Sequence, residues 1–176
     1  MIIIRGGEKI MAESNFSKYI CTEFKKDIQL PGYRAGEKDI LGQGEIEGKR
    51  RYMEHVFWMD SEVLPGAFYA EAVWFWPQNK ENMPIRQLTP EEAEKNPVLA
   101  PHAHPFPELL SYFGTNLDDP SDLGGAIEFW LEDEQYIFEK SFVVYIPEHV
   151  KHCPLKTLRM DRPMFHFTMG PGQMYR

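Results

Sequence analysis

With 176 residues, the chain is long enough for one compact domain but too short for two of ordinary size. Its residues are 43% hydrophobic and 14% aromatic, which supplies a large apolar core and argues against a mainly disordered chain. The net charge of −8 disfavours close contact with a phosphate backbone, so we do not expect nucleic acid as a partner.

The number of cysteines and the N-terminal residues indicate the cellular compartment. Two cysteines, Cys21 and Cys153, are too few for a secreted scaffold held by disulfides. The apolar residues 1–4 are interrupted by the polar residues 5–9 before a signal sequence or membrane span could form. We therefore expect a cytoplasmic protein with no membrane partner.

The N-terminal quarter of the chain differs from the rest. Residues 1–45 have mixed charge and modest periodicity, and we predict that they form an arm packed on the barrel domain of residues 46–176. Residues 51–59 and 68–76 are rich in aromatic and β-branched residues, and Pro65 and Gly66 lie between them. This composition predicts two strands joined by a turn.

A short helix is predicted at residues 89–97. Thr89 is a suitable N-cap, Pro90 occupies the first helical position, and Glu91 and Glu92 follow in the first turn. Pro97 ends the helix.

The second half of the chain indicates many short strands. Residues 116–125 have the composition of a loop. After them, five short segments are strand-like, namely residues 126–132, 136–138, 142–146, 155–159 and 163–169. Short strands at such regular spacing favour an all-β sandwich or barrel.

Acidic residues are concentrated between Thr115 and Lys140. This stretch holds eight acids, Asp118, Asp119, Asp122, Glu128, Glu132, Asp133, Glu134 and Glu139. We interpret it as a solvated loop and outer face. A calcium site in the aspartate-rich loop is the alternative, but the loop lacks the spacing and bidentate glutamate of an EF-hand.

The segment from Pro101 to Gly114 carries two histidines and a carboxylate. If its middle part is extended, the two-residue period of a strand puts His102, His104 and Glu108 on one face. Two imidazoles and a carboxylate on one face make this segment a candidate metal site.

This segment and a second one, residues 141–152, resemble the paired motifs of the cupin superfamily. The first cupin motif is Gly, five residues, His-x-His, three or four residues, Glu, about six residues and Gly; the second is Gly, five residues, Pro-x-Gly, two residues and His. His102, His104 and Glu108 match the metal ligands of the first motif. His152 matches the histidine of the second.

The resemblance covers roughly residues 50–172 and has three departures at turn positions. Asn96, Ser141 and His149 stand where the motifs have glycines, while Pro147 matches the motif's proline. The departure at His149 leaves the geometry of that turn open, but the four ligand positions are intact.

The resemblance implies an all-β, antiparallel double-stranded β-helix, that is, a jelly-roll barrel with a metal near one mouth. Three imidazoles and a carboxylate suit one divalent transition metal, Fe, Mn, Ni or Zn, rather than an ion that prefers only oxygen ligands. Four protein ligands leave positions open for a small-molecule substrate. Ligand residues that never meet, and a bound metal without turnover, are the alternatives.

Three functional hypotheses follow. The first is a metal-dependent cupin enzyme of oxygenase, isomerase or decarboxylase type, acting on a small organic molecule. The second is a non-catalytic binding or sensing module in which the metal anchors a ligand, and the third is a structural barrel without metal. We also expect a homodimer, because the arm and the aromatic strands need a packing partner.

Two further residues are candidates for proton transfer. Tyr112 shares the parity of His104 and Glu108, so it is a candidate to line the cavity and donate a proton. His166 lies on a late predicted strand and is a candidate to face the metal or to support one of its ligands. For both residues, packing in the core is the alternative.

For the other reactive or aromatic residues, we predict structural rather than functional roles. Cys153 directly follows His152, so in a regular strand its side chain faces the opposite way, and we expect neither a thiolate ligand nor a disulfide with Cys21. His149 is predicted to lie on a turn and not to bind metal. The aromatic residues 74–76 are predicted to supply core and interface side chains, with a substrate-stacking wall as the alternative.

Overall fold

The structure is a computed structural model that describes residues 16–22, 24, 28, 43–46, 48–77 and 101–171. The helix predicted at residues 89–97 lies outside the described residues, as does most of the predicted arm. Within the described part of the chain, no helix has the length and apolar character needed to cross a membrane.

Strands dominate the described chain, which also has one short 3₁₀ turn, η1 (Ser17–Tyr19). The strands of the first half are β1 (Glu45–Ile46), β2 (Lys49–Arg50), β3 (Met53–Met59), β4 (Tyr69–Phe75) and β5 (Glu108–Gly114). Those of the second half are β6 (Asp122–Leu131), β7 (Glu134–Lys140), β8 (Phe142–Ile146), β9 (His152–Met160) and β10 (Met164–Gly170).

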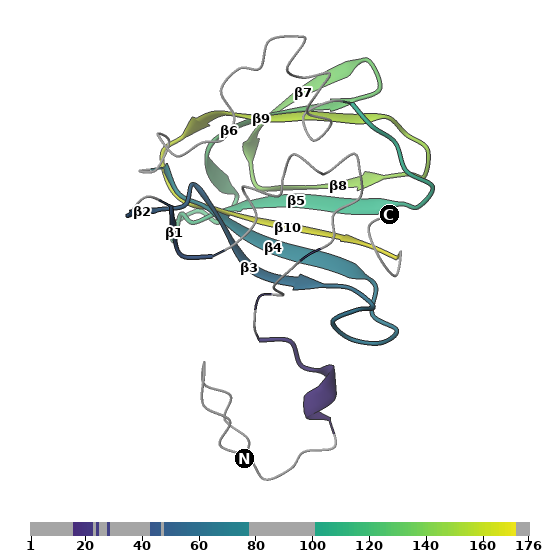
Figure 1. The fold of residues 1–176 in the computed structure, drawn as a ribbon. Coiled ribbons are helices and arrows are strands. Elements are labelled where there is room, and N and C mark those ends of the chain that lie inside the picture. The colour runs from purple at the N-terminus through teal and green to yellow at the C-terminus, as the bar shows by residue number, and fades with distance from the viewer. Residues whose placement is uncertain are drawn as a thin grey trace.

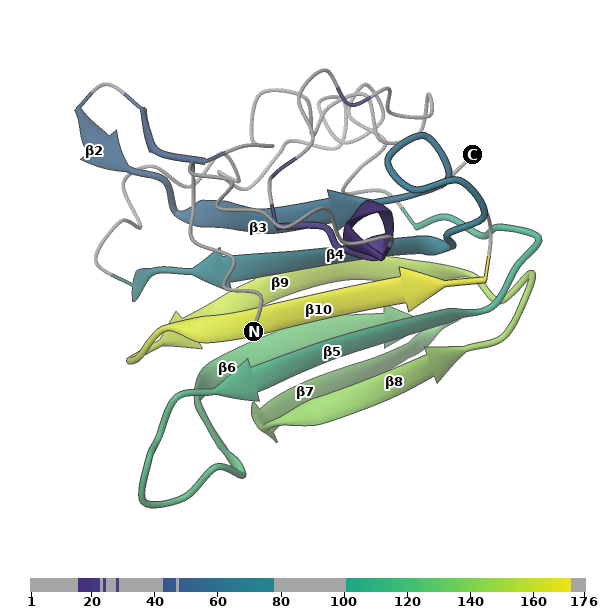
Figure 2. The same ribbon diagram turned by 90° about the horizontal axis from the view of Figure 1, so that it is seen from below.

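Two antiparallel sheets form the layers of the domain (Figure 1), and β1 and β2 pair separately as a small two-stranded sheet. One has the order β3-β4-β10-β5-β8, which Figure 2 shows edge to edge, and the other has the order β7-β6-β9. An isolated bridge between His102 and His152 extends the smaller sheet beyond β9. Strand β10 lies between β4 and β5, β8 pairs with β5, and β9 pairs with β6, so most neighbouring strands are distant in sequence, as in a jelly roll. The predicted all-β, antiparallel double-stranded β-helix is therefore confirmed.

The core lies between the two sheets. Strand β10 alternates strictly, with Met164, His166 and Thr168 buried and the residues between them partly exposed. The main apolar cluster takes side chains from both sheets, namely Tyr52, Val73, Phe75, Leu110, Tyr112, Leu123, Ile127, Phe129, Ile146, Met160 and Met164. Packing of the apolar faces from both sheets thus holds the layers together.

The two predicted aromatic strands are confirmed as β3 and β4, which pair antiparallel. Phe75 enters the core, whereas the ring of Trp74 stacks against Trp76 with centroids 5.6 Å apart. The guanidinium carbon of Arg50 lies 4.4 Å from the centroid of the Trp76 ring. The aromatic run therefore supplies one core residue and two rings packed against each other.

The loop predicted at residues 116–125 is too long, because β6 already begins at Asp122. Two consecutive glycines gave this segment the composition of a loop. A side chain at Gly125 would overlap the Arg159 carbonyl oxygen and the Met164 methyl group. Here glycine permits close packing inside a strand rather than marking a turn.

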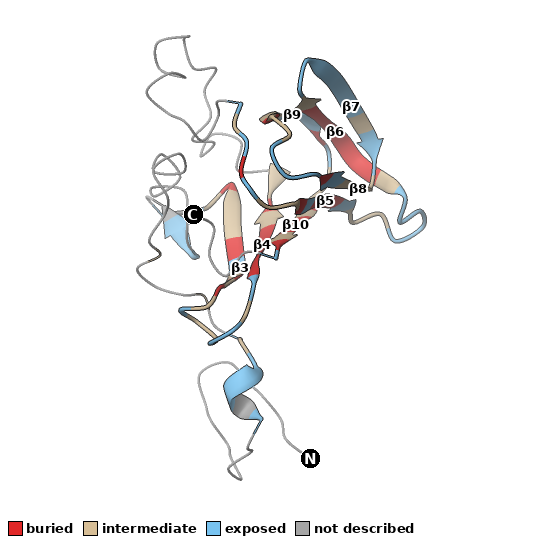
Figure 3. Cartoon of the chain, turned by 90° about the vertical axis from the view of Figure 1, so that its right-hand side faces the viewer, coloured by how far each residue is buried: buried red, intermediate tan, exposed pale blue. Residues whose placement is uncertain are grey.

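The acidic stretch is mostly solvated, as predicted. Strand β7 is exposed along almost its whole length (Figure 3). At the start of β6, Asp122 accepts hydrogen bonds from the Gly124 N–H at 2.8 Å and the Asn116 side chain at 3.0 Å, and it pairs with Arg162. Among the described residues, the acidic stretch contributes to neither of the groups with metal-binding geometry.

Two described residues of the N-terminal segment contact the larger sheet. Phe24 and Ile28 pack against the buried rings of Trp58 and Tyr69. The ring centroid of Phe24 lies 5.5 Å from that of His55. The boundary of the arm at residues 45 and 46 stays a prediction.

Candidate metal centre

The segment that holds the first motif is not an extended strand, so its predicted strand parity is wrong before Glu108. His102 forms only an isolated bridge, and β5 begins at Glu108. Pro101, Pro105 and Pro107 lack the N–H that a continuous ladder requires. The histidines are therefore placed by an irregular segment.

This irregular segment nevertheless brings His104 and Glu108 to His152. Their potential ligand atoms all lie within 4.8 Å of one another, and the three residues are 4%, 5% and 2% exposed. Glu108 Oε2 is 3.0 Å from His104 Nε2 and 3.5 Å from His152 Nε2. The structure therefore confirms that the two motifs meet in space.

Backbone carbonyls fix the orientation of both imidazoles. His104 Nδ1 lies 2.6 Å from the Phe106 oxygen, and His152 Nδ1 lies 2.9 Å from the Val150 oxygen. Since a carbonyl oxygen can only accept, Nδ1 carries the hydrogen in each ring. Nε2 is therefore the ring atom that faces the Glu108 carboxylate in both histidines, and it can hold either a proton or a metal ion there.

This arrangement fits a cation. His152 Nε2 is buried and makes no hydrogen bond within the described structure. Two nitrogen lone pairs and a carboxylate converging in a buried space are unfavourable unless a proton or a metal ion lies between them. A donor set of two imidazoles and one carboxylate suits a divalent transition ion, so the residues present fit the metal that the cupin resemblance implies.

Glu108 is held in its ionised form. Burial by itself raises the pKa of the carboxyl group, but interactions with His104, His152 and Thr168 outweigh burial and hold the pKa well below its usual range. The Thr168 hydroxyl donates to Glu108 Oε1 at 2.6 Å. This hydrogen bond leaves Oε2 directed at the two histidines.

His102, the fourth predicted ligand, packs against His152 and lies farther from His104. Its ring centroid is 4.3 Å from that of His152 and 6.1 Å from that of His104. The backbones of His102 and His152 exchange two hydrogen bonds of 3.0 and 2.9 Å. His102 belongs to a second group with His152 and Cys153 rather than to the first, so the full three-histidine, one-glutamate set stays a prediction.

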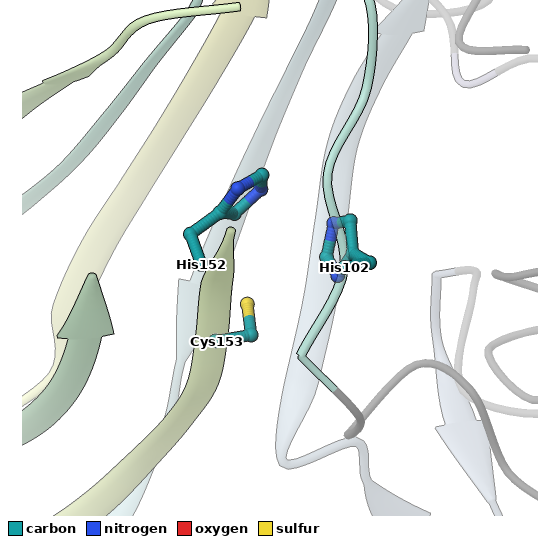
Figure 4. Close-up of side chains that lie close together, drawn as sticks. All are labelled: His102, His152 and Cys153. Carbon is teal, nitrogen blue, oxygen red and sulfur yellow. The ribbon is translucent and has the colours of Figure 1, made fainter. Parts of the chain in front are cut away.

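The prediction that Cys153 faces away from the histidines is wrong. Its sulfur lies within 4.8 Å of ligand atoms of His102 and His152, and Figure 4 shows the sulfur beside both rings. The register shows one extra residue in β9 between His152 and Leu155, and Cys153 has φ of 74°. This bulge breaks the alternation on which the prediction depended.

The turn before His152 keeps the geometry that the cupin motif obtains from glycine. His149 occupies the glycine position and has φ of 63°, in the left-handed region. Its N–H donates to the His104 oxygen at 2.9 Å, which ties the two motifs together. His149 itself is exposed and belongs to neither group with metal-binding geometry, in agreement with the prediction.

Tyr112 lies in the apolar core cluster and is 2% exposed. Burial raises the pKa of its hydroxyl well above the usual value, and nearby Tyr52, Cys153 and Glu71 raise it further. The phenol is therefore protonated at neutral pH and can donate but cannot act as a base.

His166 is also buried, with its ring centroid 4.5 Å from that of Tyr112. Its Nδ1 lies 2.9 Å from the Ser111 oxygen, which orients the ring. The proton-transfer roles of His166 and Tyr112 stay predictions.

Sequence reasoning missed two buried polar residues on the inner face of the larger sheet. Thr168 holds Glu108, and its position two residues after His166 on an alternating strand could have revealed it. Glu71 is 4% exposed, and its Oε2 lies 4.0 Å from His55 Nε2. A carboxylate inside the apolar strand 69–75 was the available signal.

Comparison with known proteins gives distant matches to solved structures. No family model matches the chain, and no curated protein sequence matches it. The chain is similar to an RmlC-like cupin from Shewanella frigidimarina NCIMB 400, with 12% identity, a TM-score of 0.37, and 74% of this chain and 86% of that chain covered.

Two further matches are similarly distant. KdgF from Halomonas sp. has 18% identity and a TM-score of 0.36, with 66% of this chain and 76% of that chain covered. The DMSP lyase DddQ from Ruegeria pomeroyi DSS-3 has 18% identity and a TM-score of 0.35, with 63% of this chain covered. The match spans only 41% of that lyase. Similarities this distant identify neither a reaction nor a substrate.

Proposed function

We propose that the protein is a metal-dependent enzyme that acts on a small organic molecule, with the ion held by His102, His104, Glu108 and His152. One observation carries the proposal: the Nε2 atoms of His104 and His152 and the Glu108 carboxylate converge in a buried space. Oxygenation, isomerisation and decarboxylation are all compatible with such a centre.

Each residue of the centre has a definite task. The Phe106 and Val150 carbonyls set the two imidazole rings, and Thr168 sets the Glu108 carboxylate. Such supporting partners increase ligand basicity and fix geometry. A bound divalent ion would polarise a coordinated substrate and orient it. The Tyr112 hydroxyl, which stays protonated, is the proposed hydrogen-bond donor.

A non-catalytic binding or sensing module is the second candidate. The observation that favours it is the deep burial of Tyr112 among apolar rings, with Phe75 and Phe142 at centroid distances of 5.4 and 5.7 Å. A tyrosine enclosed in this way has few routes to a substrate. In a binding module, metal and ligand would bind without any product being formed.

Metal analysis followed by a substrate screen tests the proposal. Protein from medium supplemented with Fe, Mn, Ni and Zn is expected to contain close to one equivalent of metal. Less than about a tenth of an equivalent would reject both metal-dependent candidates. The loaded protein is then screened with small acids, phenols and sugars for oxygen uptake or product formation, and ligand binding without turnover would favour the second candidate.

Variants separate the ligand assignment from folding. With Mn²⁺ supplied as the only metal, His104→Ala is expected to lose the ion, whereas His149→Ala, with its change on the exposed turn, is expected to keep it. Unchanged metal content in His104→Ala would contradict the assignment.

We also propose a homodimer. The outward faces of β5 and β8 carry four exposed apolar side chains, Leu109, Phe113, Val143 and Tyr145. Exposed apolar residues on adjacent strands are typical of interaction surfaces. Sedimentation equilibrium tests this proposal, and a monomeric mass would reject it.

A further inference from the structure

His152 belongs to two groups with metal-binding geometry. The first, with His104 and Glu108, offers nitrogen and oxygen donors; the second, with His102 and Cys153, offers nitrogen and sulfur. Figure 4 shows the second group, in which the Cys153 sulfur lies beside the two facing rings. The two groups differ in the chemical softness of the third donor.

The backbone that presents Cys153 has an uncommon conformation. A φ of 74° costs free energy for any residue with a side chain, and such bulges usually place glycine there. The bulge turns the sulfur toward the histidines instead of away from them. Unfavourable backbone conformations of this kind concentrate at functional sites.

His152 can serve only one of the two groups at a time. Its Nδ1 is engaged with the Val150 oxygen, which leaves Nε2 as the nitrogen available to an ion. One lone pair coordinates one ion. The two positions are therefore mutually exclusive, and total occupancy is one ion per chain.

We propose that Cys153 is a metal ligand and that the chemistry of the ion decides its position. A thiophilic ion such as Zn²⁺ binds on the sulfur side, through His102, His152 and Cys153. Mn²⁺ binds on the carboxylate side, through His104, Glu108 and His152, where His102 completes the ligand set of the proposed function. Thiolates prefer Zn²⁺, whereas carboxylates suit Mn²⁺. The inference rests on the metal site of the proposed function but adds a ligand and a selectivity to it.

Titration of the full chain with Co²⁺, a spectroscopic substitute for Zn²⁺, tests the sulfur ligand directly. A cobalt–thiolate charge-transfer band in the near ultraviolet is expected to saturate at one equivalent. Cys153→Ser is expected to lose the band, and Cys21→Ser, which removes the other cysteine of the chain, is expected to keep it. Glu108→Gln is expected to keep it too, because the carboxylate is on the other side.

Affinities measured by calorimetry test the selectivity. Cys153→Ser is expected to weaken Zn²⁺ binding at least about tenfold, since even residues that only support a ligand contribute that much, and to leave Mn²⁺ binding unchanged. Cys153→Gly is a second variant whose backbone accepts the positive φ, so its Mn²⁺ binding shows that the site is folded.

Three results would overturn the inference. They are a wild-type protein that binds Co²⁺ without the band, a band that survives Cys153→Ser, and simultaneous binding of Zn²⁺ and Mn²⁺ in wild type. In the first case, one equivalent of metal that depends on Glu108 would leave the proposed function intact. Absence of any metal would instead reject the proposed function itself.

Discussion

The two sides of His152 are built differently. On the carboxylate side, single hydrogen bonds to the ligand side chains hold the donors, since Thr168 donates to Glu108 and the Phe106 carbonyl accepts from His104. On the sulfur side, the backbone does so: His102 is paired with His152 across a bridge, and a bulge presents Cys153.

This difference predicts how each side responds to substitution. A site made by hydrogen-bonded side chains is sensitive to single polar atoms, because each buried partner left unsatisfied costs free energy. A site made by backbone geometry responds to the conformational preference of the residue at a strained position. The four predictions below test this contrast, beginning with the largest expected effect.

Glu108→Gln removes the charged donor of the carboxylate side and should have the largest effect. Mn²⁺ affinity is expected to fall more than about 100-fold, because loss of a direct ligand exceeds the effect of losing a supporting partner. Calorimetric titration measures it. Glu148→Gln, the same change at an exposed position in the turn before β9, should leave affinity unchanged. Equal losses in both variants would indicate an effect of net charge alone.

Thr168→Val removes one hydrogen bond to the same carboxylate while keeping the shape of the side chain. Mn²⁺ affinity is expected to fall about tenfold, as is typical for a partner behind a metal ligand. The free energy of unfolding of the metal-free protein should fall by about 1.5–3 kcal/mol, the usual contribution of a hydrogen bond to a charged group. Denaturant titration measures this loss. A variant with normal stability and affinity would show that Thr168 does not hold Glu108.

Acid should reduce the contribution that Glu108 makes to the folding stability of the metal-free protein. The folded pKa of Glu108 lies below its unfolded value, so its contribution to stability is present above about pH 4.3 and is lost as the pH falls toward the folded pKa. The stability difference between metal-free wild type and Glu108→Gln should therefore be largest at neutral pH and shrink in acid. Denaturant titrations at several pH values measure it. A difference that grows in acid would contradict the ionised assignment.

His149→Gly tests whether a position with positive φ responds to the conformational preference of its residue, and its expected effect is the smallest. Glycine relieves the positive φ of the turn but increases the entropy of the unfolded chain, so a net gain of about 0.5 kcal/mol is expected. His149→Ala keeps the unfavourable conformation and should show no gain. Thermal unfolding of both variants measures the difference, and a loss in His149→Gly would show that the imidazole itself stabilises the turn.

Much of the fold could be predicted from local patterns. Alternating and aromatic segments identified β3, β4, β8 and β10 closely, because side-chain periodicity in a half-buried strand follows directly from the pleat. The start of β6 was misjudged because Gly124 and Gly125 have loop composition. Only the neighbouring strand shows that Gly125 is required for close contact.

For the candidate site, too, the sequence determined one part and the tertiary structure determined another. Residue type and motif spacing determined which side chains could bind a metal, and they identified His104, Glu108 and His152 correctly as residues that meet. The tertiary structure decided the rest. The supporting role of Thr168, the position of His102 and the direction of Cys153 depend on strand register and one bulge. Register arises from contacts between residues far apart in the chain, so no local pattern in the sequence contains it.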